Sequence, residues 1–334
     1  MLSYLKQAVA DGVDGFHYDT VKHIELPGEY GSNFWNVILN NGSEFQYGEI
    51  LQDDVSNDAG FGKLMSITAS NYAQKIRSAL KDRRISAGNL MNYQVSGVDA
   101  ANLVLWVESH DNYANDDQES TWMNDSDIRL GWAMITARAK GTTLFFSRPV
   151  GDGNGTQFPG QSQIGDAGSN LYKDAIVTAG NKFHNAMVVE SEYLHNPGGN
   201  EQVAMIERST KGAVIVNLVD GDKQINSETN LADGIYTDKV SGRQFNVSNG
   251  RITGSVPSRS AVVLYDDKAS QAAQVSIDGY KEADNSISKA TEVTLKAKNA
   301  DSTTYKLGNG QEVAYKMVIK SLLVKGLKLV NQLL

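Results

Sequence analysis

The 334-residue sequence contains no cysteine, so it can form neither a disulfide framework nor a reactive thiolate. This absence fits cytosolic proteins and also secreted proteins that have large cores. The sequence also lacks an excess of positive charge, because 31 basic residues face 39 acidic ones that are spread without long blocks. The resulting net charge of −8 argues against nucleic acid or an anionic membrane surface as a partner.

Several site signatures are missing as well. The five histidines show no zinc-binding spacing. The GDGNG segment at 151–155 lacks the GK[ST] ending of a phosphate loop and therefore predicts a flexible loop. The adjacent Ser109, His110 and Asp111 cannot act as a hydrolase triad, because such triads are assembled in space and neighbouring strand side chains alternate. The N-terminus shows no signal-peptide pattern.

From residue 3 to about 190, helical patterns alternate with short apolar strands, which is typical of β/α units and predicts a parallel sheet. The clearest strands are rich in aromatic and β-branched residues; they cover 15–21, 44–50, 103–109 and 142–148. A weaker strand is expected near 82–90. Helices are expected at 62–80, at 125–139 with Asp125 or Ser126 as N-cap, at 174–188, and at the N-terminus with Leu5, Ala8 and Val9 on one face.

After 196–200 the pattern changes to short runs separated by turn residues every 8 to 12 positions, which predicts an antiparallel β domain. We therefore divide the chain into an α/β part at 1–192, a β domain at 193–267, the start of a further β module at 268–315 after a linker (268–272), and a tail at 316–334. The tail has four lysines, no acid and eleven apolar residues with no regular period. We favour an altered terminus over membrane contact for it.

Three carboxylates follow strand-like runs: Asp19, Glu49 and Asp111. The intervals between them are 30 and 62 residues, and one β/α unit takes about 30 residues. The spacing thus predicts one unit and then two, with all three acids on the same rim of a parallel sheet. Acids that share a rim can act on one substrate, and the pattern points to a site that cleaves glycans.

Three segments carry a resemblance to a known family: GFHYDTVKHIELP, EFQYGEILQD and WVESHDNYANDDQESTW. They are similar, in the right order, to motifs of bacterial α-amylases, most closely the secreted type of bacilli and lactobacilli. The resemblance covers residues 1 to about 266 and continues weakly to 315. It implies the C-terminal part of a (β/α)8 TIM barrel, an antiparallel β-sandwich domain and an incomplete β module, from an extracellular enzyme that hydrolyses α-1,4-glucans such as starch with retention.

The resemblance also implies roles for individual residues. Asp19 matches the nucleophile, Glu49 the general acid/base, and Asp111 the third carboxylate that stabilises the distorted, oxocarbenium-like sugar. Further polar residues match positions that bind sugar units or line the cleft: His17, Lys22, His23, His110, Asn115 and Asp53. Tyr47 and Tyr113 could stack on sugars, but we favour packing in the core as their role.

The sequence departs from the family pattern in two ways. His17 stands where the family has an arginine two residues before the nucleophile, and a histidine has no bidentate fork and is largely neutral at pH 7. We expect a large loss of turnover from this change. The first barrel strands of the family have no counterpart before residue 1, which would leave sheet edges unpaired, so we expect the chain alone to fold poorly or to be inactive.

The family binds calcium, and the backbone carbonyl of His23 matches one of its ligands, while the remaining ligands would come from a region that this sequence lacks. The implied partner is starch or another α-glucan, and we expect a monomer. Two competing hypotheses remain open. One is a catalytically impaired fragment or non-catalytic glycan-binding protein, and the other is a transglycosylating or debranching relative.

Overall fold

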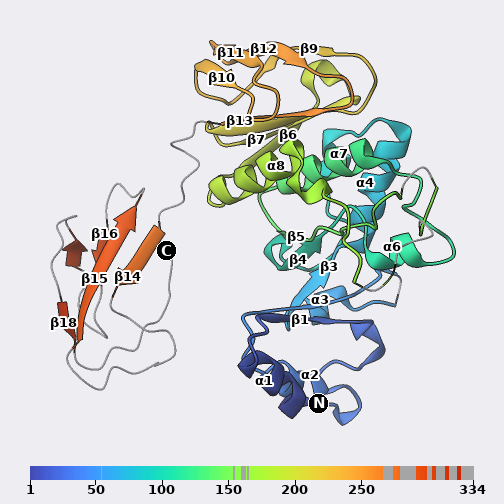
Figure 1. Cartoon of the computed structure of the whole chain (residues 1–334), viewed down its shortest axis with the longest axis vertical. Helices are drawn as coiled ribbons and strands as arrows, with labels where there is room; N and C mark the ends of the chain where they lie inside the picture. The colour runs from blue at the N-terminus through green and yellow to red at the C-terminus, as the bar shows by residue number, and fades with distance from the viewer. Residues whose placement is uncertain are drawn as a thin grey trace. The chain divides into compact units, whose positions relative to one another are not determined.

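The computed structural model describes residues 1–53, 55–152, 155–158, 163 and 165–265, together with five strands beyond residue 265. The chain forms two compact units, Met1–Asp266 and Asp267–Leu334 (Figure 1). No helix in the described part of the chain is long and apolar enough to cross a membrane.

A parallel sheet forms the first part of the larger unit. Its five strands are hydrogen-bonded in chain order; they are β1 (Gly15–Tyr18), β2 (Phe45–Gly48), β3 (Ser66–Thr68), β4 (Leu103–Leu105) and β5 (Thr142–Thr143). The predicted parallel sheet is therefore present. The strands β1, β2, β4 and β5 are shorter than their predicted runs, because the chain leaves the sheet early and enters the loops that carry the polar residues.

The third strand lies inside a segment that the sequence predicts as helix. β3 occupies 66–68, and α4 (Ser70–Asp82) begins only after it. The strand expected at 82–90 is wrong, because these residues end α4 and enter α5 (Ala87–Met91). The buried Thr68 hydroxyl donates to the Ile50 carbonyl at 2.9 Å and accepts from the Ile50 N–H at 2.7 Å. These long-range bonds fix a strand that is too short to show its own periodicity.

The expected helices are otherwise present. They include α1 (Leu2–Ala10), α7 (Asp125–Thr136) and α8 (Ala175–Ala186), beside the short α2 (Phe34–Ile38), α3 (Asp58–Phe61) and α6 (His110–Ala114). In α7 the N-cap is Asn124, not Asp125 or Ser126 as predicted, because Asn124 and Asp127 exchange backbone bonds in a capping box. Of the predicted apolar face of α1, Leu5 alone is buried. Single-turn 3-10 helices occur at Val21–His23, Glu29–Gly31, Ala100–Asn102, Leu171–Lys173 and Pro197–Gly199.

Two antiparallel four-stranded sheets follow, as expected for this part of the chain. The inner sheet has the order β13-β8-β7-β6 and the outer sheet the order β10-β11-β12-β9. Their bounds are β6 (Glu192–His195), β7 (Val203–Arg208), β8 (Gly212–Asn217), β9 (Lys223–Glu228), β10 (Gly234–Thr237), β11 (Gln244–Ser248), β12 (Arg251–Val256) and β13 (Ala261–Tyr265). β6 and β9 were not predicted from the sequence, since both are edge strands with mixed polar residues.

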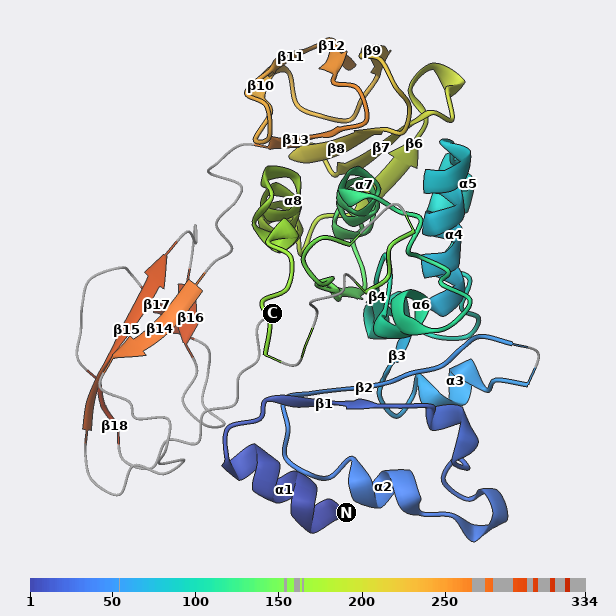
Figure 2. The same ribbon diagram turned by 45° about the vertical axis from the view of Figure 1, so that its right-hand side comes forward.

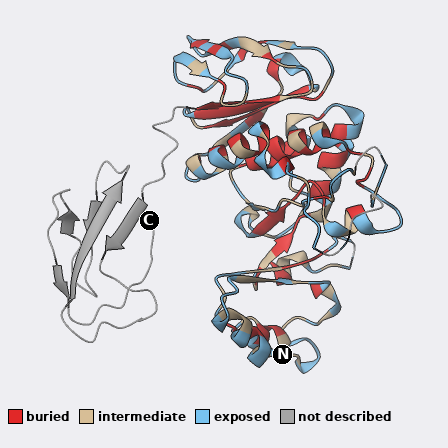
Figure 3. Ribbon diagram, in the orientation of Figure 1, coloured by how far each residue is buried: buried red, intermediate tan, exposed pale blue. Residues whose placement is uncertain are grey.

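The two sheets enclose one apolar core, to which Met205, Ile215, Phe245 and Ile252 belong. The strands β7, β8 and β13 are buried along their whole length. The second face of β8 packs against α7 and that of β13 against α8 (Figures 2 and 3). Burial on both faces explains why these strands read as continuous apolar runs. In the outer sheet, β11 alternates between exposed and buried residues.

The smaller unit is described by its strands alone. β14 (Gln274–Asp278), β15 (Thr291–Lys298) and β18 (Leu322–Val324) form one antiparallel sheet, and β16 (Thr303–Tyr305) pairs with β17 (Val313–Tyr315). The predicted linker at 268–272 and the tail at 316–334, apart from β18, lie outside the described residues.

Candidate functional site

Asp19 and Glu49 lie side by side at the ends of two paired strands. The parallel register that joins Tyr18 to Gly48 brings the next residue of each strand to the same rim. The Glu49 N–H donates to the Tyr18 carbonyl at 2.8 Å, and the Val21 N–H donates to the Glu49 carbonyl at 3.1 Å. Both strands are thus held by backbone bonds at the point where the acids begin.

Close packing beneath this rim depends on a glycine. A Cβ on Gly48 would lie 2.7 Å from a methyl of Val21 and 3.0 Å from the Met65 sulfur. Val21 is fully buried and belongs to the 3-10 turn that follows Asp19. The absence of a side chain at position 48 therefore lets this turn approach the end of β2.

The environment of Glu49 favours its protonated form. Burial raises the pKa of this carboxyl above its usual value of 4.5, and the neighbouring Asp19 and Asp111 raise it further. The Thr20 N–H, 3.1 Å from a Glu49 oxygen, opposes this shift. A carboxyl group with a raised pKa beside a second carboxylate is the arrangement that general acid catalysis needs.

His17 lies on the same side of β1 as Asp19. Its ring stacks on Tyr47 of β2, with centroids 4.8 Å apart and planes 7° apart, and it meets the edge of His110 at 6.2 Å. Burial and the nearby His110 lower the pKa of His17, although Asp19 and Asp111 oppose the shift. The imidazole is therefore neutral near pH 7 and supplies no positive charge to Asp19.

Asp111 reaches the same site from a helix and not from a strand end. β4 stops at Leu105, and Asp111 lies in the first turn of α6. Ser109 is the N-cap of that helix and forms a capping box with Asn112, so its hydroxyl has a structural partner. Its neighbour His110 is exposed, with its Nε2 atom 3.6 Å from an Asp111 oxygen. The interval of two β/α units is nevertheless met, since β3 lies between β2 and β4.

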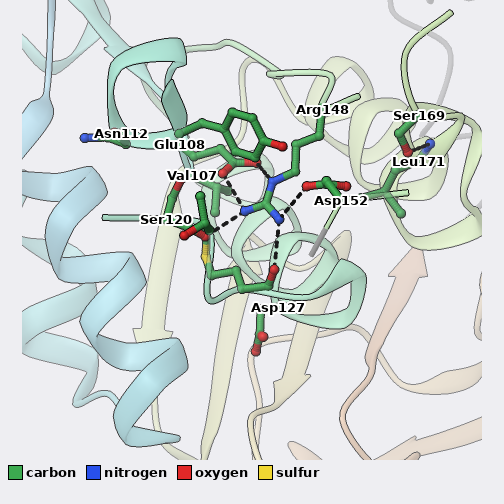
Figure 4. A network of polar contacts seen from close by, with 12 residues as sticks. Val107, Glu108, Asn112, Ser120, Asp127, Arg148, Asp152, Ser169 and Leu171 are labelled. Atoms are coloured by element: carbon green, nitrogen blue, oxygen red, sulfur yellow. Dashed lines mark hydrogen bonds and ion pairs between the residues drawn. The ribbon is translucent and has the colours of Figure 1, made fainter. Parts of the chain in front are cut away.

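A buried ion pair holds the loop in front of α6. Arg148 follows β5 and donates from Nε and Nη2 to the two oxygens of Glu108, at 2.7 Å each (Figure 4). Their side chains are 3% and 2% exposed. The guanidinium also donates to the Ser120 and Met123 carbonyls at 2.7 and 2.8 Å, and to Asp152 at 3.0 Å. Five acceptors around one cation tie the segments after β4 and β5 together.

A second arginine supports α6 from the other side. Arg77 of α4 donates to the Val107 carbonyl at 3.2 Å, to the Asn112 side chain at 3.1 Å and to Glu119 at 2.9 Å. Sequence reasoning missed these arginines and Glu108. The available signal was a charged residue inside or directly after a strongly apolar run, as in LVLWVES and TTLFFSR.

The other predicted residues fall into two places. Asn115 lines a polar cleft of about 250 Å³ that also borders Glu49 and Asp111. Lys22 and His23 line a neighbouring pocket with Glu29 and Asn57 instead. Lys22 forms an ion pair with Asp53 and donates to the Leu51 carbonyl at 3.2 Å, and its hydrogen bond lowers the pKa of Asp53. Lys22 and Asp53 are therefore each other's ion-pair partners in this structure.

The two tyrosines also have partners within the protein. Tyr113 is 1% exposed, and the Arg148 guanidinium lies over its ring at 5.1 Å. Tyr47 stacks on His17. Both contacts agree with the packing role that we favoured from the sequence.

The described residues around His23 do not make up a calcium site. Calcium takes about six to eight oxygen ligands, and the residues that line the His23 pocket include two carboxylates, Glu25 and Glu29. The Glu29 carboxylate accepts the Leu26 N–H at 3.0 Å. The His23 carbonyl could contribute one ligand, and the remaining ligands are not found within the described part of this chain.

Sequence comparison finds α-amylases. The chain is 41% identical over 300 residues to an α-amylase of Butyrivibrio fibrisolvens, covering 78% of this chain and 30% of the relative. It is 37% identical over 278 residues to an α-amylase of Clostridium acetobutylicum, covering 79% and 34%. The chain thus spans about a third of the length of the curated relatives it matches. No protein-family model matches it.

Structure comparison finds the same fold at low sequence identity. Wild-type α-amylase I from Eisenia fetida superposes with a TM-score of 0.60 at 17% identity, over 79% of this chain and 64% of that one. An α-amylase from Malbranchea cinnamomea gives a TM-score of 0.60 at 14% identity, over 80% and 59%.

Proposed function

Because the chain belongs to the α-amylase family of glycoside hydrolases, we propose that its acid cluster hydrolyses α-1,4-glucosidic bonds of starch and related glucans with retention. The observation that supports this most is the closeness of Asp19 and Glu49, whose ligand-capable oxygens lie within 4.8 Å of each other. Retaining enzymes hold their two carboxyl groups about 5 to 5.5 Å apart, whereas inverting enzymes need about 6.5 to 9.5 Å for a water molecule.

In the proposed mechanism Asp19 attacks the anomeric carbon while Glu49 protonates the departing glycosidic oxygen. Glu49 then takes a proton from water, which releases the sugar from Asp19. The raised pKa of Glu49 favours the protonated form that the first step uses. Having given that proton to the leaving group, Glu49 is the carboxylate that accepts the proton of water in the second step. Asp111 would stabilise the positive charge that develops on the sugar ring. Asn115 in the cleft, and His17 and His110 beside the acids, would contact sugar hydroxyls.

The proposal carries over features that the resemblance implies. We propose extracellular action on an α-glucan, an arrangement of barrel, β-sandwich and further β module with boundaries near 192 and 267, and no role for nucleic acid. Calcium enters only as an ion that the His23 carbonyl could help to bind, and no catalytic step depends on it.

The test is release of reducing ends from soluble starch by the full chain. Because His17 replaces the family arginine, we expect only low activity; it should be lost in Asp19→Asn, and the first product, followed by proton NMR, should be the α anomer. Equal rates for the chain and for Asp19→Asn would rule the proposal out, as would a β anomer as the first product.

A second candidate function is glycan binding with little catalysis. The observation that favours it is His17, a neutral ring at the position beside the nucleophile. Starch binding by both the unmodified chain and Asp19→Asn, without reducing-sugar release by either, would support this candidate.

A further inference from the structure

We propose that His17, Asp19 and Glu49 form a binding site for a divalent transition-metal ion such as zinc. One nitrogen of His17 and one oxygen of each carboxylate all lie within 4.8 Å of one another. Among the described residues this is the one group of three or more such side chains that gathers in this way. The three donors come from β1, the residue after it and the residue after β2, so no linear zinc motif marks them.

The distances suit a metal after small side-chain adjustments. Zinc binds imidazole nitrogen and carboxylate oxygen at about 2 Å, so the donors of a tetrahedral site lie about 3.3 Å apart. Asp19 is exposed, so its carboxylate can turn toward the His17 ring and Glu49. Glu49 is 9% exposed and is held through one oxygen by the Thr20 N–H.

The position of the imidazole is fixed by its neighbours. Stacking on Tyr47 holds the ring plane, and the pairing of His17 with Tyr47 holds the backbone beneath it. A ligand whose ring is already oriented loses less conformational freedom on binding. The His110 ring lies near, at 6.2 Å between centroids, but it is not one of the three donors.

The charges and the donor types decide which ion is favoured. Zinc would displace the proton from Glu49 on binding. Two carboxylates and a neutral imidazole then balance a divalent cation, and the repulsion between the two acids is relieved. A nitrogen donor favours zinc and its first-row neighbours over calcium, which takes oxygen ligands. Three protein donors leave a fourth position for water, as in other open zinc sites.

Metal binding would have a direct consequence for the proposed hydrolysis. An Asp19 oxygen bound to zinc cannot attack a sugar, and a Glu49 carboxylate bound to zinc cannot carry the proton for the leaving group. We therefore expect zinc to inhibit starch hydrolysis, with recovery after addition of a chelator.

The primary test measures binding and needs no catalysis, so it is separate from the test of the proposed function. Zinc is titrated into the full chain by calorimetry, with His17→Gln and Asp19→Asn as variants and His195→Gln as a matched control on the β domain. We expect one zinc per chain. Each variant should weaken the affinity by at least about tenfold, a scale reached even by outer partners of metal ligands, and the control should not.

Unchanged zinc affinity in both variants would overturn the proposal, and so would equal competition by calcium. Circular dichroism checks that each variant is folded. Nitrogen NMR of histidine in the unmodified chain gives an answer that does not depend on any variant. Zinc should shift the His17 ring nitrogens, and a His17 signal that stays in place at saturating zinc would also overturn the proposal.

Discussion

The two sides of the candidate site are built in different ways. Asp19 and Glu49 take their positions from the register of adjacent strands, through backbone bonds between neighbours in the sheet. Asp111 takes its position from α6, whose approach is anchored by the buried Glu108–Arg148 pair and by Arg77. The first side therefore depends on backbone pairing between strands that are neighbours in the sheet, and the second depends on side-chain contacts between segments 40 residues apart. We call the first the strand side and the second the helix side. A change on the strand side should mainly affect catalysis, and a change in the ion pairs of the helix side should mainly affect stability.

The largest expected effect is the loss of catalysis when Glu49 on the strand side is changed. Glu49→Gln removes the proton donor while keeping the shape, and we expect starch hydrolysis to fall about 10²- to 10⁴-fold with little change in melting temperature. The matched control is Glu44→Gln, an exposed carboxylate just before β2. A Glu49→Gln rate within a factor of two of the Glu44→Gln rate would contradict the role given to Glu49.

The next largest effect is a loss of folding stability when the ion pair on the helix side is broken. Arg148→Met leaves Glu108 buried without its partner, and we expect the free energy of unfolding to fall by about 3 to 5 kcal/mol in chemical denaturation. Adding Glu108→Leu should recover part of this loss, because the unpaired charge is then gone.

The control for Arg148→Met is a surface pair. Arg84 bonds to Glu201 but its side chain is 66% exposed, so Arg84→Met should cost less than about 1 kcal/mol. Similar losses for the two arginines would show that the buried network does not anchor the loop before α6.

A gain-of-function variant tests the neutral ring beside the nucleophile. His17→Arg places a permanent cation beside Asp19, and charge-assisted hydrogen bonds contribute about 1.5 to 3 kcal/mol. If that stabilisation acts in the transition state, turnover should rise about 10- to 100-fold. His17→Gln serves as the neutral control. An unchanged kcat in His17→Arg would remove the argument that the neutral ring limits catalysis.

The smallest expected effect is electrostatic and links the two sides. Asp111 helps to raise the pKa of Glu49, so Asp111→Asn should lower that pKa, as measured by carbon NMR of the labelled glutamate. Because the folded-state pKa is raised, protonated Glu49 favours the folded state, and this contribution is lost as the pH rises through that pKa. No change in Glu49 titration would mean that the two sides do not interact through charge.

The same contrast explains how much could be predicted from the sequence. The order of strands, the neighbouring acids and the number of β/α units between Glu49 and Asp111 follow from local patterns, and the structure has them. The strand at Ser66–Thr68 was placed wrongly, because its bonds to Ile50 are long-range. The Arg148 and Arg77 contacts were missed, since no local pattern shows which distant acceptors an arginine will reach.

The double burial of the inner sheet has a consequence for folding. The strands β8 and β13 contribute to a core shared with the outer sheet, and through their other face β8 covers α7 and β13 covers α8. Removing the β sheets would expose the apolar sides of these helices, and removing the helices would expose the sheet. The helices α7 and α8 should therefore melt together with the two antiparallel sheets, with the slowest amide hydrogen exchange in β7 and β8, the two central strands of the inner sheet.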